Sequence, residues 1–169
     1  IQKFVSELLK EKSGSVCVMD IYTGDIVTLV SNPTFDPNKF VHGMSKKDWQ
    51  KLIENKKNPL INKSVSGLYP PGSTIKPIVA LSALENDIMG TKKIIQCKGS
   101  MKLYGQTYHC WKEKGHGFMS MRSAIKQSCD IYFYELARKL GVDRLSVTAK
   151  QFGLGKKVLE SFNEEKSGI

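Results

Sequence analysis

The stretch YPPGSTIKPIVALSALE, residues 69–85, constrains the fold more than any other part of the chain. The segment from about Thr74 to Asn86 is apolar over most of its surface, which predicts a buried central helix. Its apolar positions include Ile78, Ala80, Leu81 and Leu84. Pro77 is tolerated in the first turn of a helix but not further in, so it fixes where this helix begins. Ser73 therefore lies at one end of a core element.

Ser73 and Lys76 are three residues apart, so they would be neighbours on such a helix. A serine hydroxyl needs a base to become a nucleophile, and a desolvated lysine can serve as that base. Backbone amides at the helix N-terminus add partial positive charge where an oxyanion would develop. The alternative is that Ser73 only caps the helix. Because serine and lysine are common, the S-x-x-K pattern alone does not decide between the two.

A second polar group, Ser128-Cys129-Asp130, stands between two predicted helices at about 119–127 and 131–140. Here too a serine or an aspartate could simply cap the following helix. Together with the upstream S-x-x-K pattern, however, Ser128 offers a second hydroxyl that could carry a proton. We therefore predict that these residues belong to the same site as Ser73.

The rest of the pattern predicts helices and one small sheet. The expected elements are a helix over 1–9, antiparallel strands at 15–21 and 26–31 with a turn at Gly24, a helix after Ser45 and a last helix over 142–152. The stretch from Gln96 to Gly117 shows no sustained period and is predicted to be irregular. The fold class is therefore α+β, helix-rich, rather than alternating β-α units.

Length and composition fit one globular domain, or part of one. The chain has 169 residues, 40% of them hydrophobic and 25% charged. Its net charge of +10 comes from scattered lysines, which favours a solvated surface over a nucleic-acid groove, so no nucleic-acid partner is expected. No segment approaches the roughly 18 apolar residues that span a bilayer, and the start has no leader features. We expect the chain to be part of a longer protein.

Three of the four cysteines suggest a metal site. Cys97, Cys110 and Cys129 could gather around His116, and three thiolates with one imidazole form a known tetrahedral zinc set. Four protein ligands leave no place for water, so such a zinc would be structural. It would hold the loop that follows Cys97 against the Ser128-Cys129-Asp130 turn.

Other interpretations of the cysteines stay open. The sequence lacks the C-x-x-C spacing typical of zinc sites, so a disulfide between Cys97 and Cys110 or plain thiols remain alternatives. His109 is a second candidate ligand, although its position beside Cys110 makes joint coordination awkward. Cys17 is expected to be a small buried residue of the first strand.

The strings YPPGSTIKP, WKEKGHG and SCDIYFYELARKLGVDRL, together with SNPTFDPNKFVHGMS, occur in this order along almost the whole chain. They resemble the transpeptidase domain of class B penicillin-binding proteins, most closely the elongation-type penicillin-binding protein 2 group. The resemblance implies the penicillin-binding and β-lactamase-like transpeptidase fold, here truncated and with an incomplete antiparallel sheet. Residues 1–169 would be the N-terminal portion of a single transpeptidase domain.

The resemblance also implies an activity, peptidoglycan D,D-transpeptidation by serine acyl transfer without a catalytic cofactor. Ser73 would be the nucleophile, Lys76 its base partner and Ser128 a proton relay. Asp130 stands where the wider superfamily has Asn. Stem peptides and β-lactams would react with Ser73. The longer protein would be anchored in the inner membrane, with this domain in the periplasm and a membrane polymerase of the elongation machinery as its partner.

The family has a third motif, K-[ST]-G, on a later strand. The chain contains this tripeptide at residues 12–14 and 166–168, but the first precedes Ser73 and the second follows Asp130 too closely. The functional motif is therefore expected beyond residue 169, and the chain alone is expected to be inactive. A β-lactam-hydrolysing or β-lactam-sensing relative and a non-catalytic basic binding module are the alternative functions.

Overall fold

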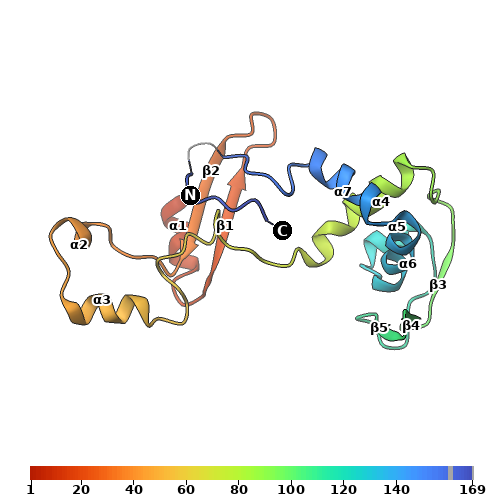
Figure 1. Cartoon of the computed structure of the whole chain (residues 1–169), viewed down its shortest axis with the longest axis horizontal. Coiled ribbons are helices and arrows are strands. Elements are labelled where there is room, and N and C mark those ends of the chain that lie inside the picture. The colour runs from red at the N-terminus through yellow and green to blue at the C-terminus, as the bar shows by residue number, and fades with distance from the viewer. Residues whose placement is uncertain (160–161, 169) are drawn as a thin grey trace. The chain divides into compact units, whose positions relative to one another are not determined.

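The computed structural model describes residues 1–159 and 162–168, and the chain divides into two compact units. Unit 1 contains residues 1–69 and the described part of 157–169, and unit 2 contains Pro70–Lys156. Figure 1 follows the chain from red to blue and labels its elements. All the candidate catalytic and metal-binding residues belong to unit 2.

The described part of unit 1 consists of a strand hairpin and three helices. Its elements are α1 (Gln2–Leu8), β1 (Gly14–Met19), β2 (Ile26–Asn32), α2 (Asn38–Val41) and α3 (Lys46–Ile53). The strands pair antiparallel around a turn in which Gly24 has a φ of +79°, as the sequence predicts. The Ser45 side chain accepts the Asp48 backbone N–H and so begins α3, also as predicted. Figure 1 shows the two strands side by side.

Two details of unit 1 differ from expectation. Cys17 is exposed, not buried, because β1 pairs with a single strand and none of its residues is fully covered in the described structure. The predicted loop after Asn32 ends in the short helix α2, which is too short to give a helical period in the sequence.

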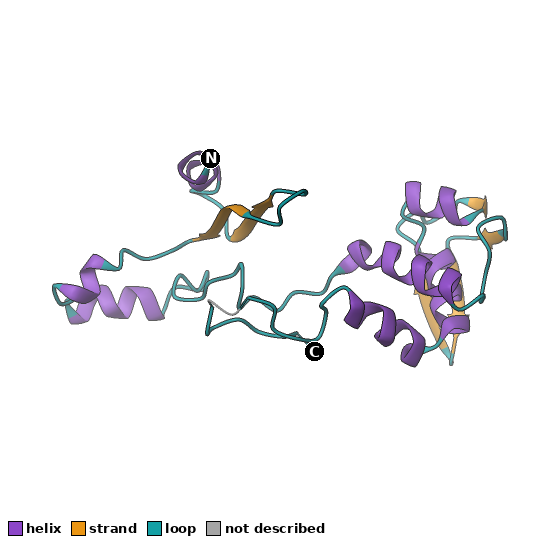
Figure 2. Ribbon diagram, turned by 90° about the horizontal axis from the view of Figure 1, so that it is seen from above, coloured by secondary structure: helices purple, strands orange, loops and turns teal. Residues whose placement is uncertain are grey.

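Unit 2 is mainly helical, with short strands (Figure 2). Its elements are the 3-10 turn η1 (Gly72–Ile75), α4 (Lys76–Glu85), β3 (Ile95–Cys97), β4 (Ser100–Leu103), β5 (Gln106–His109), β6 (Gly117–Met119), α5 (Met121–Lys126), α6 (Asp130–Leu140) and α7 (Val142–Gln151). The three predicted helices after residue 118 are confirmed. Among the described residues of either unit, no helix is long and apolar enough to cross a membrane.

Helix α4 is the central helix predicted from the sequence, with two differences. The α-helical part begins at Lys76, so Ser73 lies in the preceding 3-10 turn. The helix packs against α6 and α7 through a face that contains Val79 and Ala83, whereas Leu84 is exposed. The helix is therefore buried on one face rather than all round.

The stretch from Gln96 to Gly117 is not irregular, and here the sequence prediction was wrong. β3 pairs with β6 and β4 pairs with β5, both antiparallel. Strands of three or four residues are too short to show alternation in the sequence. The buried cluster that these strands share with the helices includes Met119, Tyr132, Leu136 and the three cysteines of the predicted metal site. The α+β fold class is confirmed.

Two glycines let the backbone of this stretch approach itself closely. A Cβ on Gly99, which has a φ of +91°, would lie 1.8 Å from the Glu113 carbonyl oxygen. A Cβ on Gly115 would lie 2.2 Å from the Cys97 carbonyl oxygen. Such distances are impossible for real atoms, so only glycine allows this packing. The packing brings the segment after Cys97 against the segment before His116.

We predict that Gly99→Ala destabilises the protein by about 3 kcal/mol or more, because it adds a backbone clash to an unfavourable φ. Gly105→Ala is the matched control, since Gly105 has a φ of +79° but nothing within 4 Å of the added Cβ. It should cost only about 1 kcal/mol. Chemical denaturation measures both, and equal losses would contradict the close approach.

Candidate active site and metal centre

Ser73 does not cap a helix. The residues at the cap positions of η1 and α4 are Pro71 and Ile75, and neither helix has a side-chain cap. Instead, the Ser73 Oγ accepts a hydrogen bond from the Ser128 hydroxyl at 2.9 Å. The capping alternative for Ser73 is therefore wrong, and the two serines meet as the sequence predicted.

Lys76 is buried, with 8% of its surface exposed, and all three hydrogens of its ammonium group are used. Nζ donates to the Ser128 carbonyl oxygen at 2.9 Å, to the Ser128 Oγ at 2.9 Å and to the Asp130 Oδ1 at 2.7 Å. Within the described structure, no hydrogen bond joins Lys76 directly to Ser73. The two are connected through the Ser128 hydroxyl, which accepts from the lysine and donates to the serine.

The Ser128-Cys129-Asp130 turn has an unusual backbone. Ser128 has a φ of +51°, in the left-handed region that costs a residue with a side chain about 1 kcal/mol or more. Cys129 takes the N-cap position of α6, again without a side-chain cap. Neither Ser128 nor Asp130 is therefore a helix cap, and the side chains of both contact Lys76.

Asp130 holds a charge beside Lys76. Burial alone would raise the pKa of its carboxyl, but the hydrogen bonds from Lys76 and from the Trp111 backbone N–H outweigh burial and lower it. The Trp111 N–H donates to Oδ2 at 3.0 Å, while Oδ1 binds the lysine. The carboxyl is therefore ionised at neutral pH. Phe133 adds a ring centroid 5.7 Å from the ammonium nitrogen.

Trp111 is the residue that sequence reasoning missed. In the sequence it is one aromatic residue beside Cys110, a position that carries no periodic signal. In the structure its backbone N–H binds Asp130, and its indole Nε1–H donates to the carbonyl oxygens of Gln127 and Ser128, both at 3.1 Å. Trp111 therefore contacts the turn that carries the candidate proton relay.

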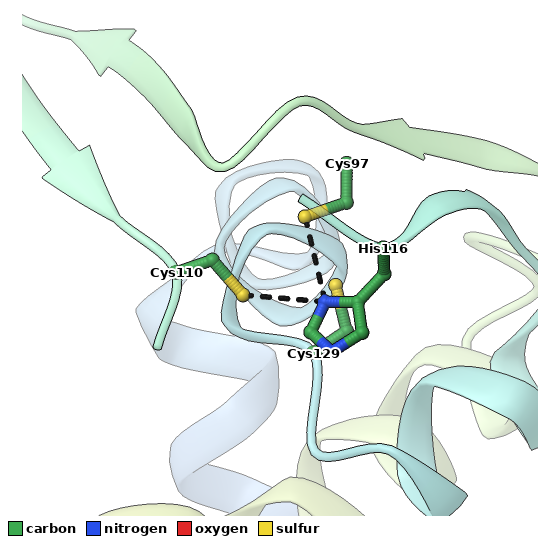
Figure 3. Close-up of side chains that lie close together, drawn as sticks. All are labelled: Cys97, Cys110, His116 and Cys129. Carbon is green, nitrogen blue, oxygen red and sulfur yellow. Dashed lines mark hydrogen bonds between the residues drawn. The ribbon is translucent and has the colours of Figure 1, made fainter. Parts of the chain in front are cut away.

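The predicted metal ligands come together (Figure 3). The ligand atoms of Cys97, Cys110, His116 and Cys129 all lie within 4.8 Å of one another. His116 Nδ1 is 3.7 Å from the Cys97 Sγ and 3.4 Å from the Cys110 Sγ. Tetrahedral zinc with its usual bond lengths would separate a sulfur from a nitrogen ligand by about 3.6 Å. His109 is exposed and outside the cluster, so it is not a ligand.

The electrostatics of the cluster also fit a cation. Burial raises the pKa of Cys97, but hydrogen bonds from the backbone N–H groups of Gly99 and His116 outweigh it and lower that pKa overall. Burial lowers the pKa of His116 and keeps it neutral, which is the form that binds metals. Burial raises the pKa of Cys129 to about 12, so without a cation this thiol keeps its proton. A metal ion would release that proton.

All four cysteines are free thiols in the structure. The donor set of three buried sulfurs and one imidazole nitrogen could hold a metal ion. The second imidazole nitrogen, Nε2 of His116, is buried and has no hydrogen-bond partner. Coordination through Nδ1 would leave Nε2 as the protonated nitrogen.

The two K-S-G tripeptides belong to unit 1, whereas Ser73 and its partners belong to unit 2. Residues 12–14 end where β1 begins, and residues 166–168 lie outside any strand. Lys166 donates its backbone N–H to the Val65 carbonyl oxygen at 3.0 Å. That neither tripeptide is the third family motif stays a prediction.

Two serine hydroxyls are joined to a buried lysine, and no histidine among the described residues hydrogen bonds to these three side chains. In such an arrangement a lysine, not a histidine, could serve as the base for a serine nucleophile. The family model of the penicillin-binding protein transpeptidase domain matches residues 14–169. The chain belongs to this family, and its fold is the penicillin-binding transpeptidase fold.

Individual relatives agree with the family. The chain is 40% identical to the peptidoglycan D,D-transpeptidase MrdA of Acinetobacter baumannii, over 100% of the chain and 25% of that protein. The crystal structure of Pseudomonas aeruginosa PBP2 in complex with WCK 5153 is similar with a TM-score of 0.86 and 40% identity, over 93% of the chain and 36% of that structure. The PBP2 in the complex of PBP2 and MreC from Helicobacter pylori is similar with a TM-score of 0.85 and 35% identity, over 92% of the chain and 29% of that PBP2.

The chain thus spans about a quarter of its curated MrdA relative and about a third of the PBP2 in each of the two solved structures. The similarity covers the part of the family domain that holds the two serines and the lysine. What the whole protein does is therefore a matter for proposal.

We predict that Asp130→Asn lowers the free energy of unfolding by about 2 kcal/mol at pH 7, because it leaves the buried Lys76 without its counter-charge. The folded protein lowers the pKa of this carboxyl, so its contribution to stability is full above the ordinary carboxyl pKa and is lost as the pH falls through the lowered value. The difference from wild type should therefore shrink below about pH 4. Urea denaturation at several pH values measures it.

Asp87→Asn is the control for this charge change. Asp87 is exposed and has a φ of +52°, which asparagine tolerates. It should leave stability within about 0.5 kcal/mol of wild type. An Asp130→Asn effect that is the same at pH 3 and pH 7 would contradict an ionised carboxylate paired with the lysine.

Proposed function

We propose that this chain carries the nucleophile and proton-transfer residues of a peptidoglycan D,D-transpeptidase of the elongation type. The observation that carries the proposal is the hydrogen-bonded series from Ser73 through Ser128 to Lys76. The relatives named D,D-transpeptidase MrdA support the reaction type. The substrate would be a stem peptide that ends in D-Ala-D-Ala.

In the proposed reaction Ser73 attacks the carbonyl carbon of the penultimate D-alanine. Its proton passes through the Ser128 hydroxyl to Lys76, which must be neutral to accept it. The proton then goes to the departing amine of the last D-alanine, which leaves an acyl-enzyme on Ser73. An amine of a neighbouring strand takes the acyl group and completes the cross-link. β-Lactams would form the same ester and stay bound.

The geometry supports separate roles for the partners of Ser73. Ser128 is the only group among the described residues that hydrogen bonds both to Ser73 and to Lys76, which fits a proton relay. Asp130 stabilises the ammonium form of Lys76 at 2.7 Å, the form that follows proton uptake. Its role would be to set how readily Lys76 accepts a proton.

We infer that residues 1–169 are the N-terminal portion of a single transpeptidase domain. The relatives extend well beyond the region of similarity, and the family's K-[ST]-G motif would come from such a further segment. That motif binds the substrate carboxylate and helps complete the oxyanion hole. Without it, transition-state stabilisation of several kcal/mol is missing, so the chain alone should have little activity.

The location and partners of the whole protein follow from the same proposal. We propose that it is anchored in the inner membrane with this domain in the periplasm, where stem peptides are cross-linked. The Helicobacter pylori relative has a solved structure in complex with MreC, which supports a place in an elongation assembly. A membrane polymerase would supply the glycan strands whose peptides Ser73 acylates.

We further propose that Cys97, Cys110, His116 and Cys129 hold a structural zinc ion. The ion would satisfy buried thiols and an imidazole, and its four protein ligands would leave no site for water. Its contribution would be to folding, by joining β3, the segment after β5 and the start of α6. Catalysis itself would need no cofactor.

The proposed function predicts acylation by a β-lactam. In a protein that carries this chain with the rest of the transpeptidase domain, benzylpenicillin should add one covalent adduct, detected by intact-mass spectrometry. Ser73→Ala should abolish the adduct because no other serine lies on the Lys76 network in the nucleophile position. Ser167→Ala, in the second K-S-G tripeptide, is the control and should keep it.

The outcomes separate the candidate functions. Loss of the adduct in Ser73→Ala establishes the acylated residue, and slow release of the adduct indicates a transpeptidase rather than a β-lactam hydrolase. A folded wild-type protein without an adduct would leave only the non-catalytic binding module. Loss of the adduct in Ser167→Ala would make the second tripeptide functional.

The proposed metal site predicts bound zinc. The purified protein should retain one equivalent of zinc after dialysis, measured by elemental mass spectrometry, and a chelator should lower its melting temperature. Cys129→Ser should lose the zinc, whereas Cys17→Ser, at an exposed cysteine outside the cluster, should keep it. Protein without zinc and with a Cys97–Cys110 disulfide would contradict the site.

A further inference from the structure

Trp111 is largely exposed, at 64% of its surface, although aromatic residues are normally among the better buried. Both of its N–H groups are nevertheless engaged in hydrogen bonds with the protein. An exposed indole can bind water instead, so these contacts are not needed to satisfy a buried group. Their direction suggests a role in holding the groups they contact.

The contacts of Trp111 converge on the groups that hold Lys76. Its backbone N–H binds Asp130 Oδ2, while the other carboxylate oxygen binds the lysine. Its indole N–H donates to the Ser128 carbonyl oxygen at 3.1 Å, and Lys76 donates to the same oxygen at 2.9 Å. Trp111 and Lys76 therefore both donate hydrogen bonds to the same turn. The Trp111 side chain is exposed and the Lys76 side chain is buried.

The Ser128 turn needs such support because its conformation is strained. Ser128 adopts a left-handed φ of +51°, which persists only where the surroundings hold it. Rotation of this peptide would turn the carbonyl away from the lysine and move the hydroxyl that links Ser73 to Lys76. A donor fixed on the carbonyl oxygen opposes that rotation.

The ring of Trp111 is itself held in place. His116 lies edge-on to it, with 5.2 Å between ring centroids and an interplanar angle of 70°. The peptide N–H of the same residue is fixed by Asp130. The indole N–H can therefore act as a preorganised donor and not as a mobile surface group.

We propose that Trp111 is a positioning residue for the acyl-transfer site, and that its indole N–H holds Ser128 in the conformation that joins Ser73 to Lys76. This inference rests on the proposed function. Trp111 touches none of the reacting atoms and acts through the Ser128 carbonyl. Its backbone N–H, which any residue except proline would keep at position 111, fixes Asp130 independently of the ring.

The test removes the indole N–H and little else. Trp111 is replaced by benzothienylalanine, in which sulfur stands in place of the N–H, within a protein that carries this chain and the rest of the transpeptidase domain. Acylation by benzylpenicillin is measured as a saturable process that gives a binding constant and a maximal acylation rate. The maximal rate should fall about tenfold, the value of one lost hydrogen bond, with the binding constant unchanged.

Two further variants show which part of the side chain matters. Trp111→Phe keeps an aromatic ring without an N–H and should slow acylation as much as benzothienylalanine does. Trp49→Phe changes the only other tryptophan of the chain, which lies in unit 1, and should leave the acylation rate unchanged. Equal melting temperatures and equal zinc contents verify that the variants are folded alike.

The outcomes are distinct. A wild-type maximal rate with benzothienylalanine overturns the inference but leaves the proposed function intact. A maximal acylation rate that falls in Trp111→Phe but not with benzothienylalanine shows that the indole ring contributes packing and that its N–H does not position Ser128. This result also overturns the inference. A wild-type protein that benzylpenicillin does not acylate overturns the proposed function and the inference together.

A measurement without turnover tests the hydrogen bond itself. In ¹⁵N-labelled protein the two indole N–H signals are assigned with the Trp49→Phe variant. The Trp111 indole N–H should exchange with solvent more slowly than that of Trp49, despite the greater exposure of Trp111. Exchange as fast as for Trp49 would mean that the bond to the Ser128 turn is absent in solution.

Discussion

The buried ammonium group of Lys76 is the constraint on which the rest of the site depends. Removing a charge from water is costly unless hydrogen bonds and an opposite charge replace the solvent. Here Ser128 and Asp130 supply every acceptor, and both come from a single turn more than fifty residues away in sequence. The packing of α4 against α6 is therefore inseparable from the chemistry, because the same contacts keep the lysine buried and connect it to Ser73.

The turn that satisfies Lys76 is itself held from several directions. Ser128 is strained, Cys129 belongs to the thiol cluster and Asp130 is shared between Lys76 and Trp111. The loop that brings Cys110 and Trp111 there depends on glycines at 99 and 115, where no side chain fits. A stretch with no periodic pattern in its sequence is thus ordered by local contacts, and these contacts end at the candidate proton relay. Packing alone would not determine that geometry, because the strands are too short to form a sheet with a face of its own.

Much of the site could be predicted from the sequence because its key residues lie at helix ends. The position of Pro77 indicated where α4 starts, and the predicted break between α5 and α6 identified Ser128 and Asp130 as site candidates. The cysteine cluster followed from residue types alone. Trp111 could not be found in this way, since its role arises from contacts between a loop and a turn. The predicted burial of Cys17 was wrong for a related reason, because the pattern of a strand does not show whether another element covers either face of that strand.

Ser73 and Lys76 lie three residues apart, but Lys76 reaches Ser73 through the Ser128 hydroxyl and not by a direct hydrogen bond, which matters for the chemistry. A lysine that bound the nucleophile directly could be placed by α4 alone. A lysine that reaches it through a hydroxyl from another turn requires that turn to be in place. In the proposed reaction, proton transfer and nucleophile positioning would be set within unit 2, whereas recognition of the substrate carboxylate would depend on the K-[ST]-G motif that we expect beyond residue 169. Changes in the Ser128-Cys129-Asp130 turn should therefore slow acylation without weakening substrate binding. Changes in the K-[ST]-G motif should slow acylation and also weaken substrate binding.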